Sequence, residues 1–194
     1  MGTNPRSLKD RRHKHSDSRS PVMIWGEGDL DKLLQKGAPA PFVLILDGIL
    51  DPHNFGACLR SAEAAGVTTV IIPKDRAVGI TAVVRQTACG AAESMQIMQA
   101  TNLARIMERL KEAGVWIVGT ADKAEKSIYQ LDLKGPIALV VGSEGEGMRR
   151  LTTEKCDFVA HVPMIGKMDC LNASVAAGVC LFEIVRQRLA VSRS

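Results

Sequence analysis

The sequence lacks the features that would place the chain in a membrane or outside the cell. Its most notable apolar run, LNASVAAGVCLF at 171–182, is far short of the roughly 20 residues of a membrane span. The N-terminus has no apolar core typical of a secretory signal. The five cysteines are widely spaced and include no CxxC pair, so they indicate neither a disulfide framework nor a zinc site. These absences predict a cytoplasmic protein with reduced thiols, no metal and no membrane partner.

Most of the chain also lacks an excess of charge. Residues 1–20 hold six Lys or Arg against two Asp, which equals the whole net charge of +4, and the remainder carries 19 basic and 19 acidic residues. We expect residues 1–40 to form a basic, flexible tail and linker, and 41–190 to form one domain. Two interpretations of the tail stay open. It binds a polyanion by counterion release, or it is a solubilising or artificially added arm.

Short apolar segments alternate with amphipathic ones, a pattern typical of an α/β fold. The strand-like segments are rich in Val, Ile and Leu without polar alternation, which predicts a mostly parallel sheet with helices on both faces. The predicted strands are 42–48, 68–73, 95–100, 115–121, 137–143 and 158–164. The predicted helices are 55–65, 80–92, 102–113, 147–155 and 171–190.

Ligands of parallel sheets bind beyond the carboxyl ends of the strands, where this sequence has GSEGEGM at 142–148. A Walker loop needs Lys after its last glycine, and this position is Met148; the glycine spacing also differs from a dinucleotide fingerprint. Glu144 and Glu146 would repel a phosphate. A positively charged nucleoside such as S-adenosylmethionine fits better. The alternative is a tight turn whose glutamates face water and the helix entry.

Two further segments carry polar residues after a strand, and each has an ordinary structural interpretation. In NFGACLR, Asn54 is placed to cap a helix, and Arg60 suits a phosphate or carboxylate or a surface pair with Glu63 or Glu93. In LNASVAAG, Asn172 and Ser174 open a helix, where such residues are usually caps.

Taken together, NFGACLR, LVVGSEGEGM, and VPM followed by LNASVAAG resemble the three ordered motifs of the SpoU RNA methyltransferases of the SPOUT superfamily, over about 42–188. Within that family, DPHNFGACLRSAEAAGV, VIIPKDR, ACGAAES and EGEGMRRLT look most like the bacterial branch that methylates a guanosine ribose in large-subunit rRNA. The resemblance implies methyl transfer from S-adenosylmethionine to a ribose 2′-hydroxyl, leaving S-adenosylhomocysteine, with no metal.

The resemblance also implies the roles of particular residues. Arg60 matches the motif arginine that contacts the target nucleotide. Because guanidinium stays protonated in proteins, we favour positioning and charge stabilisation over a role as base. Asn54 and Glu144 match positions that shape the site, and Asn172 and Ser174 match a polar pair that orients ribose or phosphate. The implied cofactor contacts, made largely by backbone groups, are Thr120, Gly142, Val162, Met164 and Leu171.

The same resemblance implies a C-terminal deep trefoil knot. It also implies a homodimer that packs through the knot and the C-terminal helix, in which the arginine and the cofactor can come from different subunits. Relatives often carry an N-terminal RNA-recognition domain, and they often have small residues where this chain has Met168, Asp169 and Cys170. Three alternatives stay open: a tRNA ribose methyltransferase, a truncated non-catalytic module that binds cofactor and RNA, and a Rossmann oxidoreductase, which the absent glycine fingerprint disfavours.

Overall fold

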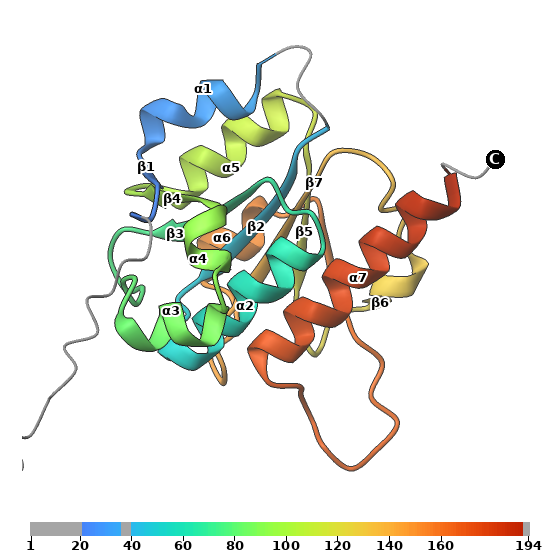
Figure 1. The fold of residues 1–194 in the computed structure, drawn as a ribbon. Coiled ribbons are helices and arrows are strands. Elements are labelled where there is room, and N and C mark those ends of the chain that lie inside the picture. The colour runs from blue at the N-terminus through green and yellow to red at the C-terminus, as the bar shows by residue number, and fades with distance from the viewer. Residues whose placement is uncertain (1–20, 36–39, 192–194) are drawn as a thin grey trace, which may run out of the picture.

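The described strands form one eight-stranded, entirely parallel sheet (Figure 1). The computed structural model describes residues 21–35 and 40–191. The strand order across the sheet is β1-β4-β3-β2-β7-β5-β8-β6. The strands are β1 Ile24–Trp25, β2 Phe42–Asp47, β3 Thr69–Pro73, β4 Gln96–Ala100, β5 Trp116–Thr120, β6 Lys126–Ser127, β7 Ile137–Gly142 and β8 Phe158–His161.

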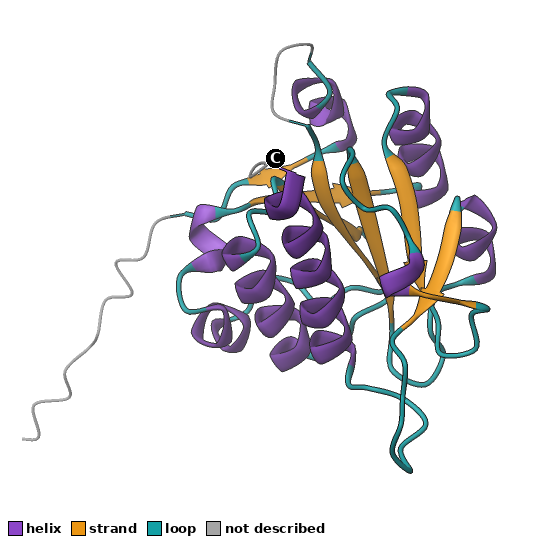
Figure 2. Ribbon diagram, turned by 90° about the vertical axis from the view of Figure 1, so that its right-hand side faces the viewer, coloured by secondary structure: helices purple, strands orange, loops and turns teal. Residues whose placement is uncertain are grey.

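Helices cover both faces of this sheet (Figure 2). Leu44 and Leu46 of β2 belong to a core shared with the helices α2, α3, α4 and α7, whereas Val43 and Ile45 belong to a second core shared with α1 and α5. The helices are α1 Leu30–Leu33, α2 Pro52–Ala64, α3 Ala82–Ala88, α4 Ala91–Ser94, α5 Leu103–Glu112, α6 Arg150–Lys155 and α7 Ala173–Val191. Because successive side chains of a strand point to opposite faces, the unbroken apolar strands correctly predicted a sheet buried on both sides.

Asp51 and not Asn54 caps helix α2. The Asp51 carboxylate accepts hydrogen bonds from the backbone N–H groups of His53 and Asn54, each at 3.2 Å, and Pro52 occupies the first turn. The predicted capping role of Asn54 is therefore wrong. Its side chain is buried inside the first helical turn and is left free to bond elsewhere.

Part of the segment assigned to the tail is folded into the sheet. Strand β1 pairs in parallel with β4, so that Ile24 lies opposite Ile97 and Trp25 opposite Met98. A truncated protein made to test the role of the basic tail should therefore begin at residue 21, because a start at residue 41 would also remove strand β1. Residues 1–20, which carry the predicted basic tail, lie outside the described residues.

The predicted helix at 80–92 is two helices, because Cys89 and Gly90 both adopt left-handed backbone conformations, with φ of 52° and 98°. The break is tied by an ion pair of 2.7 Å between Arg85 of α3 and Glu93 of α4. Helix α3 also lies directly against α2: a side chain at Gly56 would come within 2.6 Å of Thr87 Cβ. The bend at Cys89 thus faces the helix that carries Arg60.

Helix α7 packs across the same face as α2 and is anchored by buried polar groups. Gln187 accepts a hydrogen bond from the backbone N of Leu133 at 2.9 Å and donates to the backbone O of Leu131 at 3.0 Å. Its neighbour Glu183 is also buried, and a hydrogen-bonded Arg186 lowers the pKa of that carboxyl. In the part of the chain that the structure describes, none of the helices has both the length and the apolar character to cross a bilayer.

Candidate active site

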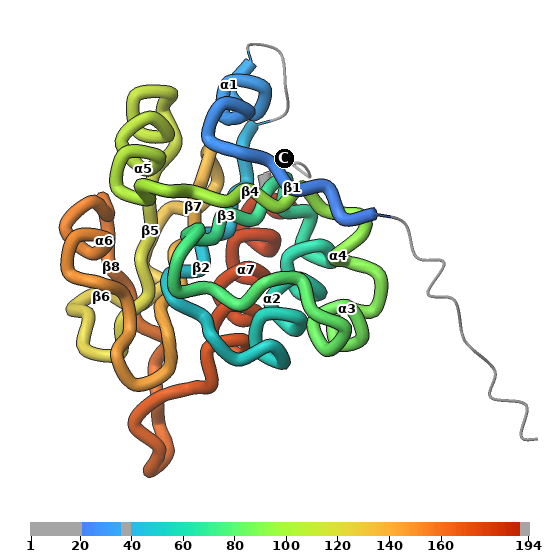
Figure 3. The backbone as a smooth tube through the Cα atoms, turned by 90° about the vertical axis from the view of Figure 1, so that its left-hand side faces the viewer, coloured from blue at the N-terminus to red at the C-terminus, as the bar shows by residue number. Residues whose placement is uncertain are grey.

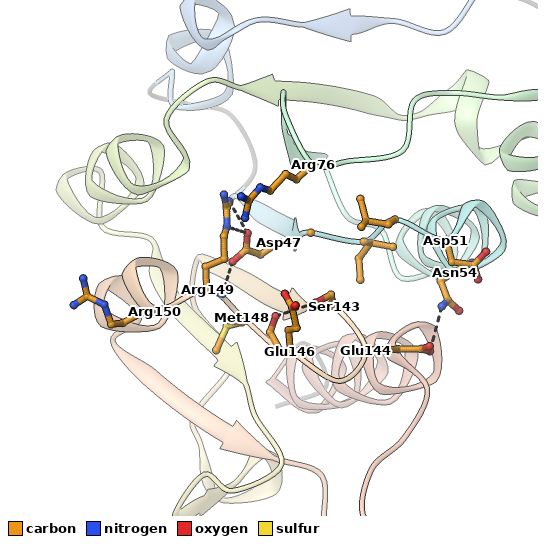
Figure 4. A pocket seen from close by; sticks show the side chains of 14 residues that line it. Asp47, Asp51, Asn54, Arg76, Ser143, Glu144, Glu146, Met148, Arg149 and Arg150 are labelled. Atoms are coloured by element: carbon orange, nitrogen blue, oxygen red, sulfur yellow. Dashed lines mark hydrogen bonds and ion pairs between the residues drawn. The ribbon is translucent and has the colours of Figure 1, made fainter.

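Asn54, Glu144 and Asn172 come from three distant segments and form one hydrogen-bonded cluster. Glu144 Oε1 accepts a hydrogen bond from Asn54 Nδ2 at 3.1 Å (Figure 4). The same oxygen accepts from the backbone N of Ala173 at 3.3 Å and from Asn172 Nδ2. Asn172 Nδ2 also donates to Asn54 Oδ1 at 2.9 Å. The first turn of α2, the loop after β7 and the start of α7 are therefore joined through one carboxylate.

Asn172 also serves the capping role that the sequence indicated. Its Oδ1 accepts hydrogen bonds from the backbone N–H groups of Ser174 at 3.0 Å and Val175 at 3.3 Å. The Ser174 hydroxyl donates to the same oxygen at 2.6 Å. Asn172 thus divides its side chain between the two tasks, with the oxygen on the helix and the amide nitrogen in the cluster. Ser174 contacts the cluster only through Asn172.

The GSEGEGM loop is a clamped turn that begins directly after β7. Ser143 and Gly147 exchange backbone hydrogen bonds of 3.0 and 2.9 Å, while Gly145 and Gly147 adopt φ of 80° and 69°. Gly142 leaves no room for a side chain, because a Cβ atom there would lie 2.1 Å from the carbonyl carbon of Gly147. Glu144 and Glu146 are consequently presented on a turn of fixed shape. Glu146 precedes the first residue of α6, Arg150, by four positions and is not a helix-entry carboxylate.

An ion pair between the exposed Arg149 and a buried carboxylate holds the far end of this loop. Asp47, the last residue of β2, is 1% exposed, and Arg149 binds it through Nε at 2.6 Å, Nη2 at 2.6 Å and the backbone N at 2.9 Å. Below the loop, Met148 and Cys156 pack against the backbone of Gly119. Burial raises the pKa of Cys156 to about 12, so this thiol is a neutral packing group. The sequence alone did not predict the pairing of Asp47 with Arg149.

Arg60 lies on α2 but does not join the cluster. Its side chain is exposed, and Nη1 donates to Cys89 Sγ at 3.4 Å, at the bend between α3 and α4. The suggested partner Glu93 is bonded to Arg85 instead. Because Asn54 and Arg60 are six positions apart on a helix with 3.6 residues per turn, they project from different sides of α2. Within the described chain, Arg60 therefore projects from a different side of α2 than the side that faces Glu144.

The residues expected to contact the cofactor gather at the carboxyl edge of three neighbouring strands. Thr120 and Gly142 end the adjacent strands β5 and β7, and Val162 follows β8, the other neighbour of β5. Met164 and Leu171 lie in the connection between β8 and α7, which extends from this edge (Figure 3). The structure thus brings the five residues to one edge of the sheet.

This connection is suited to recognition by backbone groups. Within the described residues, 21–35 and 40–191, the segment 163–171 makes no hydrogen bond, so its N–H and C=O groups are available to a ligand. The bulky side chains that depart from the family pattern, Met168, Asp169 and Cys170, are exposed and do not fill the edge of the sheet. The arrangement fits an adenosyl group read through backbone atoms.

A cavity of about 730 Å³ opens beside the cluster, and Asn54 and Glu144 of the cluster line it (Figure 4). Besides Asn54 and Glu144, it is lined by charged side chains that the motif comparison did not select. These are Asp47, Asp51, Arg76, Glu146, Arg149 and Arg150. A signal for this cavity did exist in the sequence, since most of these residues follow β2, β3 or β7 and the carboxyl ends of parallel strands share one edge.

The profile of the SpoU rRNA Methylase family matches residues 41–182, nearly the whole described domain. The chain belongs to the SpoU rRNA methylase family. The resemblance drawn from the three motifs is thus confirmed, and the Rossmann oxidoreductase is set aside. All the segments that form the cluster and the loop lie within the matched range.

Curated relatives extend this assignment within the SpoU family. The chain is 58% identical over 169 residues to 23S rRNA (guanosine-2′-O-)-methyltransferase RlmB of Pseudomonas aeruginosa, covering 87% of this chain and 68% of that protein. It is 59% identical over 165 residues to the RlmB of Shewanella oneidensis, covering 85% and 67%. The chain therefore spans about two thirds of the length of these relatives.

Solved structures of SpoU enzymes share the fold. The methyltransferase AviRb from Streptomyces viridochromogenes, in complex with AdoMet, matches with a TM-score of 0.76 at 25% identity, over 84% of this chain and 65% of that one. An AdoMet-bound rRNA methyltransferase from Sinorhizobium meliloti matches with a TM-score of 0.72 at 27% identity, over 80% and 59%. Both of these neighbours hold S-adenosylmethionine.

Proposed function

We propose that this chain transfers a methyl group from S-adenosylmethionine to the ribose 2′-hydroxyl of a guanosine in large-subunit rRNA. The observation that carries the proposal is the Asn54–Glu144–Asn172 cluster, formed by all three SpoU motifs in a chain 54–59% identical to proteins named RlmB. The substrate rRNA is favoured over tRNA because a structural relative named as a tRNA modifying enzyme is only 27% identical.

The proposed cofactor site uses Thr120, Gly142, Val162, Met164 and Leu171, largely through their backbone groups. The bound cofactor supplies an activated methyl group and a positive charge. The unpaired backbone of 163–171 and the close approach permitted by Gly142 support this placement. The proposed C-terminal trefoil knot would involve the same connection between β8 and α7.

The proposed catalytic groups act mainly by positioning. Glu144 fixes the amides of Asn54 and Asn172, and Ser174 fixes Asn172, so the polar groups offered to the ribose are oriented before RNA binds. Methyl transfer requires in-line geometry, for which such orientation contributes strongly to the rate. The Arg60 guanidinium would stabilise the negative charge that develops on the 2′-oxygen as the hydroxyl proton passes to solvent water.

Arg60 would reach this cluster from a second copy of the chain. Its separation from Asn54 on α2 supports a homodimer in which one subunit supplies the arginine and the other the cofactor. A dimer packed through the knot and α7 is the proposed arrangement. The protein would act in the cytoplasm, where its rRNA substrate is made.

The test is methyl transfer to total RNA from labelled S-adenosylmethionine, followed by mapping of the 2′-O-methylated nucleotide. Arg60→Ala should lower the rate by at least about 100-fold, since positioned charge stabilisation is commonly worth that much, and should leave cofactor binding, measured by calorimetry, unchanged. Arg105→Ala, on α5 across the sheet, is the matched control and should retain activity.

Full activity of Arg60→Ala would contradict the assignment of Arg60. A methyl group mapped to tRNA would replace the rRNA proposal by the tRNA alternative. Cofactor binding by the wild-type protein without transfer to any RNA would favour the truncated, non-catalytic module.

A further inference from the structure

Glu146 is the carboxylate of the cavity that has no protein partner. The cavity contains four carboxylates. Asp47 is bound by Arg149, Asp51 caps α2, and Glu144 holds the cluster. Across residues 21–35 and 40–191, by contrast, Glu146 makes neither a hydrogen bond nor an ion pair, although it lines the same cavity as Asn54 and Glu144.

The turn fixes the backbone of Glu146, although the Glu146 side chain has no partner among the described residues. It lies between the left-handed Gly145 and Gly147, inside the turn closed by the Ser143–Gly147 hydrogen bonds. In Figure 4 it is drawn between the Asp47–Arg149 pair and Glu144. Because the backbone of this turn is already fixed, binding of a ligand requires ordering of the exposed Glu146 side chain but little ordering of the backbone.

The cavity suits a nucleotide in size, and both acidic and basic side chains line it. Its volume of about 730 Å³ is within the range of about 300–1,000 Å³ typical of small-molecule sites. Asp47 neutralises the charge of Arg149. Arg76 also lines the cavity and makes no hydrogen bond or ion pair with the described residues, so its guanidinium can bind a backbone phosphate. None of the predicted cofactor residues Thr120, Val162, Met164 and Leu171 lines it. The cavity is therefore lined by other residues than those predicted to contact the cofactor.

We infer that Glu146 selects guanine at the target position by accepting hydrogen bonds from its N1–H and its 2-amino group. This inference rests on the proposed function. An ionised carboxylate offers acceptors only, and its two oxygens match two adjacent donors in a bidentate, charge-assisted contact. Guanine presents that pair of donors on its Watson–Crick edge. Adenine and cytosine instead place an unprotonated ring nitrogen there, which the carboxylate repels, and uracil offers a single N–H between two carbonyl oxygens.

The test compares two RNAs that differ by one amino group. Synthetic fragments of rRNA spanning the mapped nucleotide carry either guanosine or inosine at that position, and kcat/KM is measured for each with the full chain. The wild-type protein should prefer guanosine by roughly 10- to 100-fold, the factor expected for one hydrogen bond to a charged group. In Glu146→Gln and Glu146→Ala the value for guanosine should fall by a similar factor, and the preference over inosine should shrink toward one.

The control is Glu112→Gln, an exposed carboxylate at the end of α5 outside both the cavity and the cluster, which should behave as wild type. Thermal unfolding and S-adenosylmethionine affinity of the Glu146 variants should equal those of the wild type, which separates base selection from misfolding and from a cofactor contact.

An unchanged preference for guanosine in both Glu146 variants would overturn the inference while leaving the proposed function intact. A weakened cofactor affinity with an unchanged preference would also overturn it and assign Glu146 to the cofactor. If the wild-type protein methylated no RNA, the proposed function itself would fail, and the inference with it.

Discussion

The pair Asp47–Arg149 shows how one residue connects the core to the site. Asp47 is the last residue of a central strand, and its carboxylate is almost fully buried. A buried charge without partners is costly, and here its partners are the guanidinium and the backbone N of Arg149, at the end of the GSEGEGM loop. Loop position and core stability are therefore coupled at this residue.

Arg149→Ala should lower the free energy of unfolding by about 3 kcal/mol, because it removes the charged partner of a buried carboxylate and leaves only the backbone hydrogen bond. Arg150→Ala is the matched control. It removes an exposed i,i+4 pair with Glu154 and should cost less than about 1 kcal/mol. Urea unfolding followed by circular dichroism measures both. Equal losses in the two variants would show that Asp47 does not depend on Arg149.

Single residues also mark the limit of what the sequence could predict. Asn54, Glu144 and Asn172 were selected from motifs, but their mutual hydrogen bonds depend on three loops meeting in space, which residue types alone do not encode. Asn54 was misassigned as a cap because Asp51, three positions earlier, is an equally good capping residue. Arg60 was expected to contact the target nucleotide or to pair with Glu63 or Glu93, and only the structure shows that it donates to Cys89 Sγ.

At the scale of elements, the turn after β7 depends on a position without a side chain. Gly142→Ala would place a methyl group 2.1 Å from the Gly147 carbonyl carbon and 2.2 Å from the Met148 backbone N, so the turn has to open. We expect a loss of about 3 kcal/mol in the free energy of unfolding, together with weaker S-adenosylmethionine binding. Thermal unfolding and calorimetry measure the two effects.

Gly79→Ala is the control for this change, because no atom lies within 4 Å of the added methyl group and the backbone is not left-handed there. It should alter stability by less than about 0.5 kcal/mol. A Gly142→Ala protein as stable as Gly79→Ala would mean that the turn is not as tightly closed as the structure indicates.

The long elements were predictable because apolar periodicity over many residues is a strong signal. Six of the seven described helices, with α3 and α4 in one predicted segment, and six of the eight described strands correspond to predicted segments, and the two-residue strands β1 and β6 were missed. A pair such as Ile24–Trp25 has too few residues to show a period. The strand order was not predictable either, since parallel neighbours such as β2, which ends at Asp47, and β7, which begins at Ile137, are far apart in the sequence.

At the scale of the whole molecule, helix α7 carries an apolar stripe on its outer side. Val175, Phe182 and Leu189 are 49%, 50% and 55% exposed and recur every seven residues, so they lie along one face. Other α7 residues, such as Leu181 and Ile184, are buried in the core. The stripe is thus additional to the face that folds the domain, and it supports the proposed packing of α7 against a second copy.

Phe182→Glu should convert the proposed dimer into a monomer, because it places charge at the centre of an apolar interface, where charged residues are depleted. Sedimentation velocity measures the mass, and Leu151→Glu on α6, across the sheet and similarly exposed, should leave it unchanged. Arg60 does not contact Glu144 within one chain, so the monomer should also lose methyl transfer while it still binds S-adenosylmethionine. A Phe182→Glu protein that is monomeric and fully active would show that Arg60 reaches the site of its own subunit, and an unchanged dimer would place the interface away from α7.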